Sequence, residues 1–359
     1  MKLIGKILAY PLFAVNILIA LLLIFSCYGS LAAPIGRWPF ASLSGLAFPF
    51  LFIANLLFLF LWMFTWKKGA IVPLATILIC LTPTLKYSPL HFMKEGKVQE
   101  PYITIVSYNT EGFGIDDNKD WTVGNPVLNY STGLGADILF LQEATRAVMN
   151  IASKDRNIKA IYPYVGIPSG TSDVSCFSKF PIIKNEYIGF ENTGNGCQYL
   201  RFLVGSDTLA VYNCHLQSNK LNETEISEYQ KFIKNPTDST HYKASKKVLK
   251  NLLESTSHRA GQARMIADRA RNETAKYVIV CGDFNDTPLS YSHRVFNRFM
   301  TDAYAKSGVG MGITYHEHGL YYRIDHIFCS RNITPLHTWI DRTQKDSDHY
   351  PVISKIRLE

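Results

Sequence analysis

The first ninety-four residues contain no acidic side chain, which restricts this part of the chain more than any other feature. Two long apolar segments, residues 7–28 and 43–66, each reach the roughly 20 residues that a bilayer-crossing helix needs. A third apolar segment, residues 70–85, is shorter and contains two prolines. It predicts either a third span, which we favour, or a re-entrant helix. We therefore predict a membrane anchor over residues 1–94.

A cleaved signal peptide is the alternative for the first segment. Its apolar run is too long for that, and a second span follows after a short loop. Lys2 and Lys6 precede the first segment, and Lys67 and Lys68 separate the second from the third, whereas Arg37 lies alone in the first loop. Because cytoplasmic loops are enriched in Lys and Arg, both Lys pairs are expected inside.

The number of spans decides where the rest of the chain lies. Three spans place it outside, and two place it in the cytoplasm. We predict an integral protein of the bacterial inner membrane with its large domain in the periplasm.

The net charge of +8 lies mostly in the first hundred residues, which hold eight basic and two acidic side chains. The remainder is close to neutral, so the basic balance is poor support for a nucleic-acid partner. A local basic patch is the alternative, and a solvated helix face is the interpretation we favour. In either interpretation the basic residues concerned are Lys243, Lys246, Lys247, Lys250, Arg259 and Arg264.

Residues 95–359 read as one α/β domain. Short apolar runs predict strands at 103–108, 138–141, 174–177, 209–216, 277–281, 324–329 and 351–356. The stretch 245–272 has a helical pattern, and the mixture indicates α/β layers. Five cysteines lie here without metal-type spacing, and most are expected to be buried in strands. Cys176 and Cys197 would form a disulfide if they lay on neighbouring strands of an exported domain.

Polar side chains stand at the ends of six predicted strands. The run 278–286 is the most informative, because its apolar strand leads into Gly-Asp-Phe-Asn-Asp. Taken alone, that run is equally an ordinary Asp/Asn turn; six such ends in one domain indicate a site. The candidate residues are Asn109, Gln142, Glu143, His215, Asp283, Asn285, Asp325, Asp348 and His349.

This set of side chains suits metal-assisted hydrolysis of phosphate esters. Mg²⁺, with Mn²⁺ as the alternative, prefers oxygen ligands and needs only one or two carboxylates beside a substrate phosphate. Glu143 is the best ligand candidate, and Asp283 is placed to align and deprotonate an attacking water. Asn109 and Asn285 supply neutral hydrogen bonds. The two histidines can donate protons to phosphoryl oxygens as negative charge grows there.

The motifs Asn, Gln-Glu, His, Gly-Asp-Phe-Asn, Ile-Asp-His-Ile-Phe and Ser-Asp-His-Tyr-Pro occur in this order over residues 101–359. Their types and order closely resemble the endonuclease/exonuclease/phosphatase superfamily, which has the deoxyribonuclease-I-like fold. The resemblance implies a four-layer α/β sandwich, in which two facing, mostly antiparallel sheets are flanked by helices and the site lies at one edge. It also implies that Glu143 is the principal metal ligand, with Asn109 beside the metal or phosphate and Asp348 as a further carboxylate.

The same resemblance assigns the proton-transfer groups. His215 would contact the phosphate or donate a proton, and Asp283 would be the base that orients water, with Asn285 as its phosphate-binding partner. Asp325 would orient His349 through a carboxylate–imidazole hydrogen bond. The presence of His215 separates the chain from apurinic-site DNA repair enzymes without choosing among the other branches.

Four nearby polar residues have structural interpretations. His326 alternates with its neighbour in the strand and should face away from the site. Gln142 either bonds within the fold or binds substrate, and Arg323 either contacts a phosphate or pairs with a carboxylate. Asp286 is expected to cap the turn before Pro288.

These inferences predict a membrane-anchored, Mg²⁺-dependent phosphodiesterase or phosphatase. Its substrate would be a lipid headgroup, a nucleic acid or a small phosphoester, and nothing in the sequence indicates a protein partner. An exported metal-dependent nuclease is the alternative activity. A non-catalytic membrane protein that binds a ligand is the alternative of another class, and the presence of Glu143, His215, Asp283 and His349 argues against it.

Overall fold

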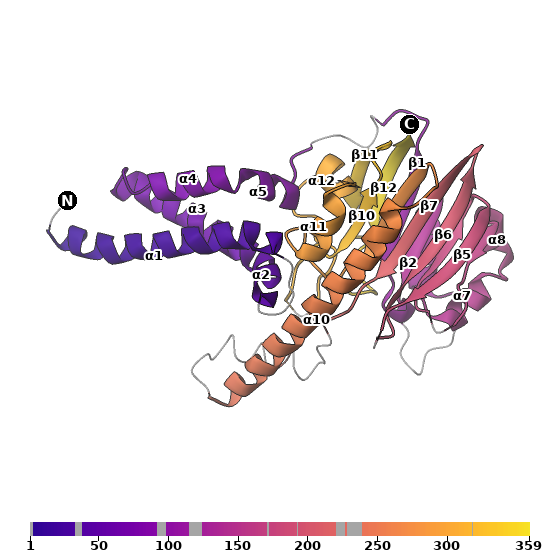
Figure 1. Cartoon of the computed structure of the whole chain (residues 1–359), viewed down its shortest axis with the longest axis horizontal. Coiled ribbons are helices and arrows are strands. Elements are labelled where there is room, and N and C mark those ends of the chain that lie inside the picture. Colours follow the sequence, from indigo (N-terminus) through magenta and orange to yellow (C-terminus); the bar gives the residue numbers. More distant parts are fainter. Residues whose placement is uncertain are drawn as a thin grey trace.

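The computed structural model describes residues 3–32, 38–91, 98–114, 124–170, 172–191, 193–219, 227, 239–317 and 319–359. The N-terminal part, described over residues 3–32 and 38–91, is an elongated helical arm that projects from a compact sandwich, and its first helix begins at the far end of the arm (Figure 1). The helices of the arm are α1 (Leu3–Tyr28), α2 (Pro39–Leu43), α3 (Phe48–Thr65), α4 (Ile71–Ile79) and α5 (Leu81–Tyr87).

Two described segments of the arm, Ala9–Leu31 and Phe40–Thr65, are long and apolar enough to cross a membrane. The third predicted segment is helical, but it is divided into α4 and α5 at Cys80 and does not form one helix of that length. The chain runs outward along α3 and returns along α4 and α5, so the turn with Lys67 and Lys68 lies at the end away from the sandwich (Figure 1). The predicted domain boundary at residue 94 lies outside the described residues.

The sandwich contains two six-stranded sheets. The first has the order β11 (Ile333–Ile340), β12 (Val352–Leu358), β1 (Ile103–Asn109), β2 (Ile138–Gln142), β4 (Ser175–Ser178) and β3 (Tyr164–Gly166). The second has the order β5 (Ile182–Gly189), β6 (Gly196–Val204), β7 (Asp207–His215), β8 (Tyr277–Asp283), β10 (Asp325–Cys329) and β9 (Thr301–Asp302). Within the described sheets, β1 with β2 and β7 with β8 are parallel, and the other pairs are antiparallel.

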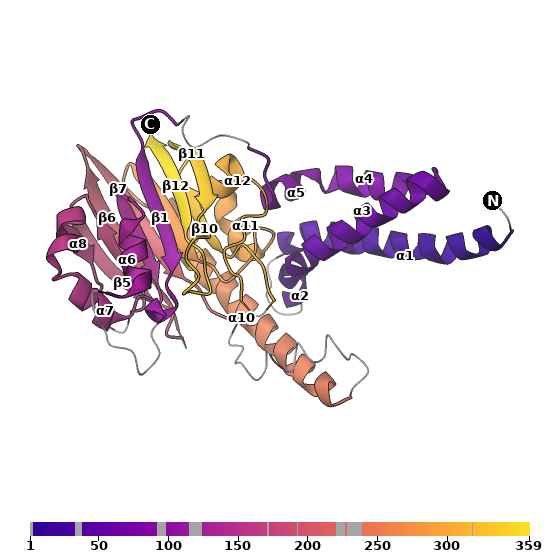
Figure 2. The same cartoon turned by 180° about the vertical axis from the view of Figure 1, so that it is seen from behind.

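Helices cover the outer face of each sheet, which gives four layers. The first sheet is covered by α6 (Pro126–Gly133), α7 (Arg146–Ala152) and α8 (Arg156–Ile161) (Figure 2). The second is covered by α10 (Ser239–Arg271) and α11 (Tyr291–Asn297), while α12 (Ala303–Ser307) packs near β10 and β11. Side chains such as Phe140 and Phe202 fill the space between the sheets. Burying one such side chain contributes roughly 1.5–3 kcal/mol. The predicted four-layer fold is confirmed.

Several local predictions need correction. Asp348 and His349 lie in the loop before β12 and not in a strand. Cys176 is on β4 and Cys197 on β6, in different sheets, and all seven cysteines are free, so the proposed disulfide is absent. Arg259 does not belong to a surface patch on α10, because its side chain is buried and lies 3.5 Å from the carboxylate of Asp286. The side chain of Lys243 lies outside the described residues.

Candidate active site

The candidate site forms where parallel strands of both sheets end at one edge. In the first sheet Asn109 lies opposite Gln142, and in the second Asp283 lies opposite His215 on one side and Asp325 on the other. Because neighbouring parallel strands end at the same edge of a sheet, polar residues at these ends converge. The Asn109 amide donates to the Asp283 carboxylate over 3.1 Å, which joins the two sheets at the site.

Gly282 allows β8 to place Asp283 at this edge of the sheet. Its φ of +125° is accessible to glycine at little cost. A Cβ atom at this position would overlap the carbonyl oxygen of Cys214 on the neighbouring strand β7. The glycine of the Gly-Asp-Phe-Asn run is therefore required for close approach of β7 and β8.

Asp283 is buried and accepts several hydrogen bonds. The backbone N–H of Asn285 donates to its Oδ1 over 2.7 Å, and the Asn285 amide donates to its Oδ2 over 3.2 Å. Burial, together with the negative charge of Asp325, raises the pKa of Asp283 to about 6. The group is thus largely ionised at neutral pH and still basic enough to accept a proton.

His215 and His349 lie on either side of Asp283. The Nε2 atom of each imidazole is 3.8 Å from Oδ2 of Asp283. Nδ1 of His349 lies 2.8 Å from the Asp325 carboxylate, and Nδ1 of His215 contacts the carboxylate of Asp173. Nε2 of His215 has no hydrogen-bond partner among the described residues. Each imidazole is therefore oriented through Nδ1, with Nε2 toward the site.

The carboxylates behind the imidazoles keep both rings charged. Burial alone would lower the pKa of His215, but the hydrogen bond and charge of Asp173 raise it to about 9. Burial also opposes protonation of His349, and the charges of Asp325 and Asp283 overcome it, so the pKa of His349 lies well above its usual range. Both rings are cationic N–H donors at neutral pH.

A group of carboxylates forms the more open side of the site. The Glu143 side chain is 40% exposed and accepts a 3.0 Å hydrogen bond from Asn109. Glu111 accepts a 2.8 Å hydrogen bond from the backbone N–H of Asp348. Burial, reinforced by the negative charges of Glu111 and Glu143, raises the pKa of Asp348 to about 7. A divalent cation such as Mg²⁺ would relieve the repulsion among these carboxylates, and their oxygen atoms are ligands of the type that it prefers. Glu143, Asp348 and Glu111 would hold such an ion.

Asn109 and Asp325 have positions that limit their roles at a metal. The Asn109 amide nitrogen faces both Glu143 and Asp283, and its Oδ1 accepts from the backbone N–H of Glu111. Asn109 therefore holds carboxylates in place. Atoms of Asp283, Asp325 and His349 also lie within 4.8 Å of one another, a spacing that suits a metal. Since Nδ1 of His349 already binds Asp325, this trio is better suited to moving a proton.

Four polar residues near the motifs lie outside the site. The Gln142 amide donates to Asn213 over 2.6 Å between the sheets, and Nε2 of His326 lies 2.9 Å from the backbone oxygen of Asp286. Arg323 is buried, donates to the backbone oxygen of Lys86 and stacks on Tyr304, and among the described residues it forms no ion pair with a carboxylate. Asp286 accepts from the backbone N–H of Thr287, as a turn cap does, and from the hydroxyl of Ser292.

Sequence reasoning missed Asp173 and Glu111. Asp173 directly precedes the predicted strand at 174–177, and Glu111 follows Asn109 by two residues. A carboxylate at the edge of a strand was the available signal for Asp173. Its partner is 42 residues away in the other sheet, so the pairing had no local signature.

Comparisons with known proteins identify the family of the sandwich. The model of the Endonuclease/Exonuclease/phosphatase family matches residues 106–349. A second family model, for a domain of unknown function, matches residues 6–87. No match to a protein of curated function was found.

Solved structures show the same fold. Truncated TDP2 from Caenorhabditis elegans has 18% identity and a TM-score of 0.51, and the match covers 71% of this chain and 97% of that one. TDP2 from D. rerio, complexed with a single strand DNA product, has 17% identity and a TM-score of 0.51, with 72% and 100% covered. With the family match over most of the sandwich, this chain belongs to the endonuclease/exonuclease/phosphatase family, whose members are metal-dependent hydrolases of phosphoester bonds.

Proposed function

We propose that the chain is a membrane-anchored, Mg²⁺-dependent phosphoester hydrolase whose sandwich faces the outside of the cytoplasmic membrane. The observation that carries the catalytic part is the position of Asp283. It is a buried carboxylate between two imidazoles that are themselves backed by carboxylates. A binding protein has no evident need for such a combination, since burying the four ionisable groups Asp283, Asp325, His215 and His349 costs free energy that pairing must offset.

The chain's own residues account for activation of the attacking water and for stabilisation of the charge that develops on the phosphate. Asp283, held by Asn109 and Asn285, accepts the proton of the attacking water. His215 and His349 donate N–H groups from Nε2 to phosphoryl oxygens and so stabilise charge that increases in the transition state. When bound, Mg²⁺ would supply further positive charge to the phosphate and would be held by Glu143, Asp348 and Glu111.

The arm supports the proposed orientation. Lys67 and Lys68 lie at the end of the arm away from the sandwich (Figure 1). If this Lys pair is cytoplasmic, and if α4 with α5 completes a third crossing, the sandwich lies on the outer side. A reporter fused after Glu359 would then be active in the exported compartment. Activity of the fusion in the cytoplasm would contradict the orientation and leave the catalytic proposal intact.

The catalytic proposal is tested with the full-length protein in detergent micelles. Substrates are a generic phosphodiester, DNA, RNA, sphingomyelin and a phosphoinositide, each with Mg²⁺ and with a chelator. We expect metal-dependent turnover of at least one substrate and a loss of on the order of 10²-fold or more in Asp283→Asn. The matched control is Asp268→Asn, which changes an exposed carboxylate on α10 and should turn over normally.

The outcomes separate the alternatives. Turnover that persists with chelator and in Asp283→Asn would refute the proposed chemistry. Preference for DNA or RNA over every other substrate would select the nuclease alternative. Absence of turnover on all five substrates would support a ligand-binding role.

A further inference from the structure

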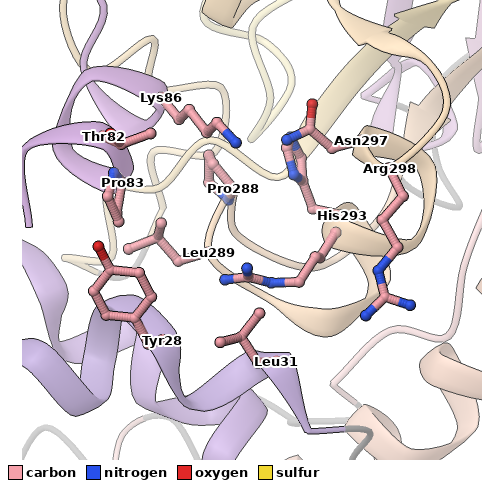
Figure 3. A pocket seen from close by; sticks show the side chains of 11 residues that line it. Tyr28, Leu31, Thr82, Pro83, Lys86, Pro288, Leu289, His293, Asn297 and Arg298 are labelled. Carbon is pink, nitrogen blue, oxygen red and sulfur yellow. The ribbon is translucent and has the colours of Figure 1, made fainter.

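A cavity of about 480 Å³ lies at the junction between the helical arm and the sandwich. We call it the junction pocket. Its walls come from the end of α1 and the residues after it, from α5, from the loop before α11, and from α11 itself (Figure 3). The lining residues are Tyr28, Leu31, Thr82, Pro83, Lys86, Pro288, Leu289, His293, Arg294, Asn297 and Arg298. None of the residues assigned to catalysis lines it.

The charged lining of the junction pocket is entirely basic. Among the described residues, Lys86, Arg294 and Arg298 line it, and no Asp or Glu does. Within the described part of the chain, none of these three side chains has a carboxylate within 4.0 Å. Lys86 points its ammonium group toward the centre of the pocket in Figure 3. Three cationic side chains lining one cavity without a carboxylate partner give it a positive potential, which favours a bound anion.

Arg294 is held rigidly between the two parts of the molecule. Its guanidinium donates to Ser30 Oγ over 3.2 Å and to the backbone oxygen of Cys27 over 3.3 Å. Burial and the nearby charge of Arg298 lower the pKa of Arg294. The two guanidinium charges therefore repel each other, and an anion bound in the pocket would relieve the repulsion.

The position of the pocket indicates where the anion comes from. Tyr28 and Leu31 lie at the end of the apolar segment Ala9–Leu31, and Lys86 lies in the last turn of α5, beyond the apolar segment that ends at residue 85. Aromatic residues and basic side chains at the end of a span typically lie at the depth of lipid headgroups. The pocket combines this basic wall with apolar walls from Leu31, Pro83 and Leu289, as a headgroup joined to acyl chains would need.

We propose that the junction pocket binds the phosphate group of an anionic phospholipid, and that the bound lipid links the arm to the sandwich through Lys86, Arg294 and Arg298. The site is separate from the catalytic edge. The inference shares with the proposed function only the membrane anchor. Failure of every hydrolysis assay would therefore leave it standing, and its own failure would leave catalysis untouched.

The test measures lipid binding by the full-length protein in detergent micelles. Phosphatidylglycerol, phosphatidylcholine or inorganic phosphate is added, and both the melting temperature and lipid adducts in native mass spectrometry are recorded. Lys86→Gln with Arg298→Gln removes two pocket charges, and both side chains are exposed, so the fold should tolerate the change. Lys67→Gln with Lys68→Gln removes the same charge from the far end of the arm and is the matched control.

We expect phosphatidylglycerol to raise the melting temperature and to bind the wild-type protein and the control equally. Its affinity for the pocket variant should fall on the order of tenfold or more, because each cation near an anionic lipid contributes a several-fold factor. Arg298→Lys, which keeps the charge, should retain most of the binding.

Three results would overturn the inference. These are equal binding by the pocket variant and the control, equal effects of phosphatidylcholine and phosphatidylglycerol, and saturation by inorganic phosphate that leaves no further effect of lipid. The last result would identify a site for a free anion instead of a lipid.

Discussion

The pairing of His215 with Asp173 makes a prediction that can be worked out from the structure. Asp173→Asn keeps a carbonyl oxygen that can accept the Nδ1–H of His215 but removes the negative charge. In the wild-type protein the pKa of His215 is raised to about 9, although burial opposes protonation. The charges of Asp283 and Glu143, 3.8 and 3.6 Å from Nε2, would still raise the pKa of His215, but without the charge of the directly bonded Asp173 burial should dominate and lower this pKa below its usual value of about 6.5.

The size of the effect follows from these values. At pH 7 a group with a pKa of about 9 is about 99% protonated, and one with a pKa below about 6.5 is protonated in about a quarter of molecules or fewer. Loss of the proton alone should thus reduce kcat at pH 7 by about fourfold or more. Looser orientation of the ring could bring the loss to about 100-fold, as for other residues that position a catalytic group. Acidification would restore little, because Asp283, with a pKa of about 6, becomes protonated over the same range.

The assay combines the pH dependence of kcat with an NMR titration of selectively labelled histidine. In Asp173→Asn the His215 signal should titrate below pH 6.5, and the alkaline limb of the pH profile should move to lower pH. Asp268→Asn is again the control, since its carboxylate is exposed on α10. If His215 in Asp173→Asn still titrates near pH 9, the Asp173 charge does not set its ionisation and the argument is wrong.

Two further predictions concern stability. Gly282→Ala should lower the free energy of unfolding by at least about 3 kcal/mol in urea denaturation, because its Cβ would overlap Cys214 and its φ is positive. The control Gly261→Ala on α10 should be neutral or stabilising by about 0.5–1 kcal/mol. Equal urea midpoints for the two variants would contradict the close approach of β7 and β8. Although burial opposes it, hydrogen bonds from Tyr199, Arg201 and the backbone lower the pKa of Glu273 to about 2. Its ionised form therefore stabilises the fold above about pH 4.5, and this contribution is lost as the pH falls toward 2. Glu273→Gln should lower the free energy of unfolding by about 1–2 kcal/mol at pH 7, a value already discounted for screening at the partly exposed Arg201, and by close to nothing near pH 2. A difference in unfolding free energy between wild type and variant that does not change with pH would refute this prediction.

The sequence predicted the strand ends better than the complete sheets. Runs such as 277–281 are apolar because β8 is buried on both faces, and they are easily recognised. Strands β5 and β11 lie at sheet edges and were missed, because polar residues such as Lys184 and His337 interrupt their apolar residues and leave no continuous apolar run. Edge strands carry less of the hydrophobic signal because one side of them is solvated.

Contacts within the site were predicted where both partners belong to recognisable motifs, as Asp325 and His349 do. The pairing of His215 with Asp173 depends on how a loop before β4 in one sheet reaches the end of β7 in the other. No periodicity in the sequence encodes such an approach. For the same reason the position of Arg323, buried against the arm at Lys86, required the tertiary structure.

Glu143 and Asn285 share a backbone feature that connects the fold with its chemistry. Each closely follows a buried strand, and each has a positive φ, 49° and 51° respectively. Such a conformation costs of order 1 kcal/mol or more for a residue other than glycine, and it persists only where the surroundings enforce it. Here a regular continuation of β2 or β8 would carry these side chains past the edge where Asn109 joins the two sheets. The left-handed turn instead brings Glu143 to the Asn109 amide and the Asn285 amide to Asp283. Glycine would relieve the strain at either position, but it would remove the side chain that the turn presents to the site.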